Sequence, residues 1–120
     1  MSSNRPETTD TIAIVLMVIL SVPVFYFALF VPFETDTGDS VVHYFFARYA
    51  FGDPVLFLDH WAKPFFTLFA SPFAQFGFGG MKLFNGLAGL LSAWFAYSIA
   101  KKLDLKFAWL AIILVLFAPS

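Results

Sequence analysis

The chain alternates between long uncharged hydrophobic runs and short polar segments. The run from Ile12 to Phe33 contains no charged residue. As a helix it would be about 33 Å long, enough to cross a bilayer core of about 30 Å. A second uncharged run, Leu83 to Ala100, would be about 27 Å long, close to the minimum for a span. A third run begins at Phe107. This pattern predicts an all-α integral membrane protein with two complete transmembrane helices and a truncated third.

The polar segments set the boundaries between these runs. We expect a cytoplasmic tail at 1–11, a transmembrane helix at 12–33, an outside loop at 34–80, a second transmembrane helix at 81–100, a cytoplasmic hinge at 101–106 and the start of a third transmembrane helix at 107–120. The first ten residues are polar and are expected to form a disordered tail. An uncleaved anchor is favoured over a cleaved signal peptide, whose apolar core is usually roughly 7–15 residues. The short third run suggests a piece of a longer protein rather than a short hairpin protein.

The outside loop mixes acids with aromatic residues and predicts two helices lying in the membrane interface. Asp39 or Ser40 is expected to cap the first, which would run to about Phe51 and be ended by Gly52-Asp53-Pro54. Both segments are too interrupted to span, and amphipathic juxtamembrane helices fit this composition.

The second loop helix is expected to begin near Lys63, with Pro64 in its first turn. Pro72 should interrupt or end it, and the glycines within 77–80 should then break the chain. In the span that follows, small residues offer a face on which another helix can pack closely, namely Gly86, Gly89 and Ala93.

Composition supports the membrane class and excludes several functions. The chain is 60% hydrophobic and 12% charged, whereas soluble domains average roughly 45–50% and about 25%. A net charge of −1 without a basic stripe predicts no nucleic-acid partner. With no Cys there is no disulfide, thiolate metal site or Cys nucleophile, and two His are too few for a His-only metal site.

The cations predict the orientation. The hinge and tail carry Lys101, Lys102, Lys106 and Arg5, whereas the outside loop carries Arg48 and Lys63. Because cytoplasmic segments are enriched in Lys and Arg, the N-terminus should be cytoplasmic and the loop should face outward. We expect an integral protein of a bacterial inner (cell) membrane.

Asp39 is the first candidate for chemistry. It comes just after the first span and shares a helical face with His43 at the i, i+4 spacing, while Tyr44 and Arg48 share a roughly opposite face. A carboxylate at this position can act as general base toward an acceptor hydroxyl. It can equally cap the helix, because Asp is a favoured N-cap residue.

Lys63 is the second candidate, since a lone ammonium in an apolar interfacial stretch suits a lipid phosphate. A snorkelling Lys that only anchors the segment is the alternative. His60 and Asp59 lack a spacing typical of metal ligands. Glu34 and Asp36 are expected to be solvated loop acids, with Asp36 in reserve for the role of base.

These residues, taken in order, resemble the start of membrane glycosyltransferases of the GT-C superfamily. The closest likeness is to the branch with protein O-mannosyltransferases and lipid A aminoarabinose transferases. The matching order is Ile12–Phe33, Gly38-Asp39-Ser40, Ala47-Arg48, Gly52-Asp53-Pro54 and His60-Trp61-Ala62-Lys63-Pro64-Phe65. Many members have Glu where this chain has Ser40, which keeps Asp36 in reserve.

The resemblance implies sugar transfer, with inversion, from a polyprenyl-phosphate-linked donor to a lipid, glycan or protein hydroxyl acceptor. It implies Asp39 as general base, and Lys63, with Arg48 and His43, as substrate-binding residues. No cofactor follows with certainty, although a divalent metal is compatible with the chemistry. A small non-catalytic scaffold or assembly subunit is the alternative. The 120-residue chain alone is expected to be inactive.

Overall fold

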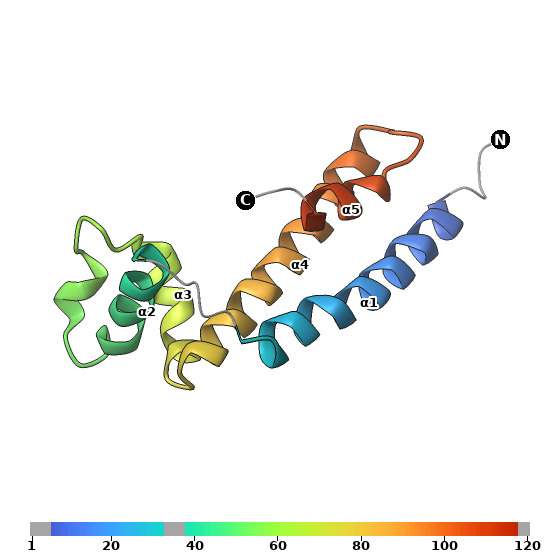
Figure 1. Ribbon diagram of the computed structural model, residues 1–120. Coiled ribbons are helices and arrows are strands. Elements are labelled where there is room, and N and C mark those ends of the chain that lie inside the picture. The colour runs from blue at the N-terminus through green and yellow to red at the C-terminus, as the bar shows by residue number, and fades with distance from the viewer. Residues whose placement is uncertain (1–5, 33–37, 118–120) are drawn as a thin grey trace. The chain divides into compact units, whose positions relative to one another are not determined.

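The computed structural model describes residues 6–32 and 38–117, and within these ranges it contains helices and no β-strand (Figure 1). The helices are α1 (Pro6–Phe30), α2 (Asp39–Tyr49), the 3-10 helix η1 (Pro54–Phe57), α3 (Pro64–Ala74), α4 (Phe78–Lys102) and α5 (Leu110–Phe117). The all-α prediction is therefore confirmed. The chain forms two compact units: a long-helix unit, Met1–Phe25 with Gly86–Ser120, and a short-helix unit, Tyr26–Asn85.

Helices α1 and α4 are each 25 residues long, and both are long and apolar enough to cross a membrane. Helix α1 begins at Pro6, because proline suits the first turn of a helix. The expectation of a disordered tail is therefore wrong for residues 6–10, which are helical. The helix ends at Phe30, just before Val31-Pro32, where the residue preceding proline disfavours helical geometry. The expectation that the helix continues to Phe33 is therefore wrong, since Val31 and Pro32 are not helical; Phe33 itself lies outside the described residues.

Helix α4 begins earlier than the hydrophobic run suggests. Gly77 adopts a left-handed conformation with φ of 80° and makes the turn by itself, and α4 then starts at Phe78. The expected break at the following glycines is wrong. Gly80 instead lies within α4 against the carbonyl of Phe73, where a Cβ would have no room. At the other end α4 continues to Lys102, so the predicted hinge loses its first two residues to the helix.

A hydrogen-bonded turn ends α4. The Leu105 amide donates to the Ala100 carbonyl at 3.1 Å, and the Asp104 amide donates to the Lys101 carbonyl at 3.0 Å. Asp104 adopts φ of 53°. This pairing is the Schellman motif, usually completed by glycine or asparagine. The third apolar run becomes helical at Leu110 rather than at Phe107.

Small residues hold the long-helix unit together. Its buried core consists of Ala13, Ala93, Tyr97, Ala100, Ala108 and Ile112. A Cβ on Gly86 would lie 3.3 Å from a methyl group of Val24 and 3.4 Å from the Phe25 ring, so α1 and α4 approach closely there. The prediction of a close-packing face is confirmed for Gly86 and Ala93, and that face is used within the chain. Nothing lies within 4 Å of the equivalent position on Gly89.

An ion pair joins α1 to the end of α4. The Lys101 Nζ lies 2.6 Å from both carboxylate oxygens of Asp10, and the Tyr97 hydroxyl donates to the same carboxylate. Asp10 thus compensates the charge of one of the three hinge lysines.

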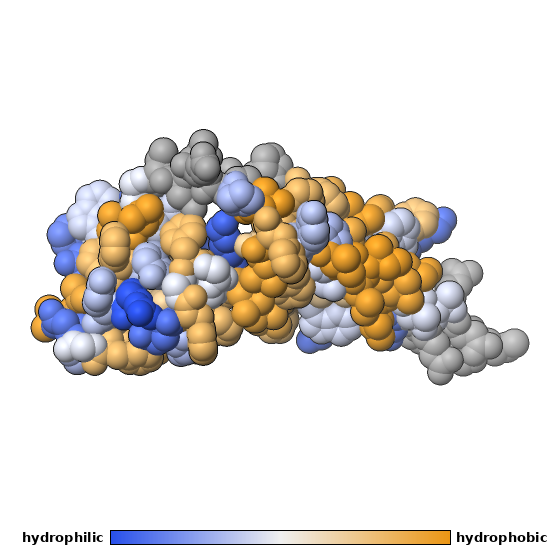
Figure 2. Space-filling view, turned by 60° about the horizontal axis from the view of Figure 1, so that its bottom comes forward, coloured by the Kyte–Doolittle hydropathy of each residue, from blue (hydrophilic) through white to orange (hydrophobic). Residues whose placement is uncertain are grey.

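Large hydrophobic side chains cover much of the outer surface. On α1, Val22 is 67% exposed and Phe30 is 72% exposed. Hydrophobic residues dominate the surface over the long helices, whereas hydrophilic and hydrophobic residues mix over α2 and α3 (Figure 2). Large contiguous apolar areas of this kind are typical of surfaces that contact a membrane or another protein.

Candidate functional site

Helices α2 and α3 lie side by side and run in the same direction (Figure 1). Near their starts, the His43 ring is 5.8 Å from the Phe66 ring. At their ends, Arg48 Nη1 lies 3.2 Å from the Ala74 carbonyl oxygen. Both N-termini therefore lie at the same end of the pair, because η1 and its flanking turns return the chain to that end. We call this the N-terminal end of the α2–α3 pair.

Alanines allow the two helices to approach. Ala47 on α2, and Ala70 and Ala74 on α3, are fully buried and share a cluster with Met81. Aromatic rings close the cluster, as the T-shaped contact of Phe66 with Phe84 at 5.5 Å illustrates. Small residues let helix backbones come close, and so the sequence of these short helices favours a tight pair.

Asp39 is the first residue of α2, and Gly38 is the N-cap, with φ of 39°. The interpretation of Asp39 as the cap is therefore wrong, because a residue with positive φ occupies that position and glycine adopts it readily. The Asp39 side chain is exposed in the first turn, where a carboxylate is stabilised by the helix dipole. It is accessible to an incoming hydroxyl.

Two buried polar atoms belong to residues in the first half of these helices. In the part of the chain that the structure describes, His43 Nδ1 and Thr67 Oγ1 are the buried side-chain atoms without a hydrogen-bond partner. Each lies near the start of its helix, at i+4 from Asp39 and from Lys63 respectively. Leaving such a group unpaired costs about 1–3 kcal/mol. The N-terminal end of the pair thus carries unused hydrogen-bonding capacity.

Lys63 is the N-cap residue of α3, with Pro64 following in the first turn, so the predicted start of this helix is confirmed. Pro72 was expected to interrupt or end the helix, but the helix passes through Pro72 without a break and ends two residues later, at Ala74. Lys63 is exposed, and no side chain caps the amides of the first turn. An ammonium beside an uncapped helix N-terminus, where the dipole is positive, favours an anion.

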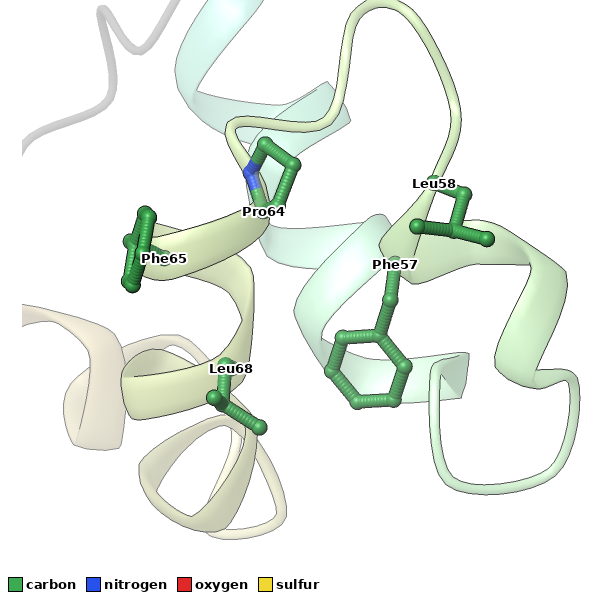
Figure 3. A pocket seen from close by; sticks show the side chains of 5 residues that line it. All are labelled: Phe57, Leu58, Pro64, Phe65 and Leu68. Carbon is green, nitrogen blue, oxygen red and sulfur yellow. The ribbon is translucent and has the colours of Figure 1, made fainter.

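A small apolar pocket opens beside this helix start. It has a volume of about 180 Å³ and is lined by Phe57, Leu58, Pro64, Phe65 and Leu68. Its walls come from the end of η1 and the first turns of α3 (Figure 3). Lys63 directly precedes the lining residue Pro64 in the chain.

Arg48 lies at the opposite end of the pair. Along α2 it is nine residues from Asp39, or about 13.5 Å of helix rise. Its guanidinium donates to the backbone carbonyls of Ala74 and Gln75. The side-chain amide of Gln75 donates in return to the Arg48 backbone carbonyl at 3.1 Å. It therefore binds the C-terminal carbonyls of α3, a role that sequence reasoning missed. Substrate contact by Arg48 stays a prediction.

The remaining acids have local roles. Asp53 caps η1 by accepting from the Val55 amide at 3.3 Å, and Asp59 accepts from the Trp61 amide at 2.9 Å. Within residues 6–32 and 38–117, no three His, Asp or Glu side chains gather as a metal site would require. The reserve base Asp36 lies outside the described residues, as does Glu34.

Lys82 is a further cation that sequence reasoning left aside. It stands in the second turn of α4, with its Nζ 3.4 Å from the Val31 carbonyl oxygen and 5.8 Å from the centre of the Phe78 ring. The sequence feature that could have drawn attention to Lys82 is its place as a single lysine at the edge of an otherwise uncharged run.

No family model, curated protein or solved structure matches this chain.

Proposed function

We propose that this chain is the N-terminal part of a membrane glycosyltransferase that moves a sugar from a polyprenyl-phosphate-linked donor to a hydroxyl acceptor. In this proposal α1 and α4 span a bacterial inner membrane and the α2–α3 pair lies at its outer face. The resemblance to GT-C enzymes motivates the reaction, since the chain carries that family's order of residues.

The observation that carries the proposal is the parallel arrangement of α2 and α3. It brings an exposed carboxylate, Asp39, and an exposed ammonium, Lys63, to one end of the pair. Two helix N-termini without side-chain caps lie at that same end. A base for a hydroxyl and a positive site for a phosphate are what transfer from a phosphate-linked donor requires.

The proposed step balances with these groups alone. The acceptor oxygen forms a bond to the anomeric carbon of the sugar while the bond from that carbon to the phosphate oxygen breaks. The lipid phosphate leaves with the electron pair and is stabilised by Lys63 and the N-terminal amides. Asp39 takes the proton of the acceptor hydroxyl. Attack from the side opposite the phosphate inverts the anomeric centre, and the apolar pocket beside Lys63 accommodates the first isoprenyl units.

Hydrogen bonding inside the long helices supports membrane insertion. The hydroxyls of Ser21, Ser92 and Ser98 donate to carbonyls of the preceding turn at 2.7–2.8 Å. Within the apolar part of these helices, serine is satisfied without water, as hydrocarbon surroundings demand.

Donor binding tests the proposal. With Trp94 and Trp109 replaced by Phe, Trp61, which is 61% exposed, becomes the only tryptophan and reports on the Lys63 region. In lipid nanodiscs, its fluorescence should respond to a polyprenyl phosphate and not to the matching polyprenol. Lys63→Gln should weaken that binding about tenfold or more, because a charge-assisted hydrogen bond is lost.

Lys106→Gln is the matched control, since it removes the same charge from the other unit and should leave the Trp61 response unchanged. An equal response to the phosphate and the neutral alcohol, or unaltered affinity in Lys63→Gln, would contradict the proposed donor site.

A further inference from the structure

An apolar groove, separate from the pocket beside α3, lies at the turn between α4 and α5, in the long-helix unit. Its volume is about 360 Å³, within the usual range of about 300–1,000 Å³ for small-molecule sites. Its principal walls are Ala100, Leu105, Lys106, Phe107, Leu110 and Leu114. The one charged residue in the lining is Lys106, and so the groove suits a molecule with an apolar chain and a negative group.

The turn fixes both walls of this groove. The hydrogen bond from the Leu105 amide to the Ala100 carbonyl, at 3.1 Å, folds one wall against the other. Hydrophobic contact across such a turn commonly accompanies the Schellman motif. The outer wall stays open, since Leu110 is 40% exposed and Leu114 is 70% exposed.

Two lysines supply the positive charge. Lys106 Nζ lies 5.4 Å from the centre of the Phe107 ring, which also lines the groove. Lys102 ends α4 and is exposed. The third lysine of the turn, Lys101, is paired with Asp10. The positive charge in the groove lining is therefore that of Lys106, and Lys102 adds to the positive charge of the same turn.

Aromatic residues indicate the depth of this turn in a membrane. Phe107 and Trp109 form a T-shaped contact with ring centres 6.4 Å apart. Trp beside Lys, directly after a long apolar helix, is typical of the membrane–water interface. At that depth the surrounding molecules are lipids, and basic pockets among transmembrane helices bind anionic headgroups.

From this combination we infer that the α4–α5 turn binds one anionic phospholipid. The acyl chain occupies the apolar groove, and the headgroup phosphate lies against Lys106 and Lys102. The inference rests on the proposed membrane insertion and not on glycosyl transfer. The two proposals use different units and different reporters, so either one can fail alone.

The test uses Trp109 as the only tryptophan, with Trp61 and Trp94 replaced by Phe. The full chain is placed in phosphatidylcholine vesicles containing a small fraction of phosphatidylglycerol whose acyl chains are brominated, because bromine quenches nearby tryptophan. Brominated phosphatidylglycerol should quench Trp109 at lower mole fraction than brominated phosphatidylcholine. Removing one lysine should weaken this preference about fivefold, and Lys102→Gln with Lys106→Gln roughly 25-fold.

Lys63→Gln is the matched control, and it should retain the full preference of the wild-type chain. Asp104→Asn should retain or increase the preference, since it removes a negative charge from the same turn. Equal quenching by both lipids would overturn the inference, as would a preference that survives in the double variant. Protection of Trp109 from both lipids would show that another helix or a second copy covers the groove, and it would overturn the inference too.

Discussion

The role available to Asp39 depends on its position relative to the start of α2. Its type and place are compatible with a cap or a base, and Gly38 occupies the cap position in the structure. Asp39 therefore stands exposed in the first turn, four residues before the half-buried His43. The capping explanation therefore no longer accounts for Asp39, and its role as the base stays a prediction.

Asp39→Asn should abolish most transfer without unfolding the protein. The amide keeps the size of the side chain but cannot accept the proton of the acceptor hydroxyl. In membranes containing the protein as the cell makes it, the rate from a radiolabelled lipid-linked sugar should fall roughly 100-fold or more. The melting temperature should stay near that of the wild type.

Asp104→Asn provides the control for Asp39, because it removes a carboxylate at a left-handed position that asparagine tolerates. It should leave the rate unchanged. Near-normal transfer by Asp39→Asn together with a large loss in Asp36→Asn would move the role of base to Asp36. Near-normal transfer by both variants would remove this loop from catalysis.

At the scale of single elements, two glycines of α4 differ in how closely other atoms approach them. Gly80 lies against the Phe73 carbonyl, whereas the Cβ position of Gly89 meets nothing within 4 Å. The first glycine is required by the close approach of α3 and α4, and the second only lowers the helical propensity of α4.

Substituting alanine at each position should separate these effects. Gly80→Ala should lower the free energy of unfolding by about 1–3 kcal/mol, because backbone atoms must move to admit the new methyl group. Gly89→Ala should raise it by up to about 1 kcal/mol, through helix propensity. Denaturant unfolding in detergent micelles, followed by circular dichroism, measures both. Equal effects of the same sign would show that the contact with Phe73 is not what requires glycine at position 80.

At the scale of the whole molecule, orientation depends on a narrow balance of charge. Because α4 begins at Phe78, Lys82 belongs with the loop side, where it joins Arg48 and Lys63. In the proposed topology the other side carries Arg5 and the three lysines of the turn after α4. The margin is therefore four cations to three, and it still favours a cytoplasmic N-terminus.

Thiol labelling decides this orientation, because the chain contains no Cys of its own. Two exposed residues are replaced by Cys, one in each variant. They are His60, whose side chain is 83% exposed, and Leu103, which is 66% exposed. An impermeant reagent should label His60→Cys in intact cells, and should label Leu103→Cys only after the membrane is permeabilised. The reverse pattern would place the α2–α3 pair in the cytoplasm.

Much of the fold follows from local sequence. Uncharged runs predict the two long helices, since each helix satisfies its own backbone. Gly52-Asp53-Pro54 and Pro64 predict where α2 ends and where α3 starts, because proline and glycine act within one turn. The boundaries that differ, at Pro6 and Phe78, also have local causes, namely proline in the first helical turn and the left-handed Gly77, which the hydrophobic pattern alone does not reveal.

The arrangement of the candidate site was decided by tertiary structure. Helical periodicity along one segment carries no information about the direction of a neighbouring helix, and so the sequence alone did not place Lys63 at the same end as Asp39. The structural partners of Arg48, the carbonyls of Ala74 and Gln75, lie 26 and 27 residues further along the chain, beyond the reach of helical periodicity. The ion-pair partner of Lys101, Asp10, lies 91 residues away and could not be inferred from the sequence. Charges and polar groups pair through space, and only the packed helices determine which partners come within reach.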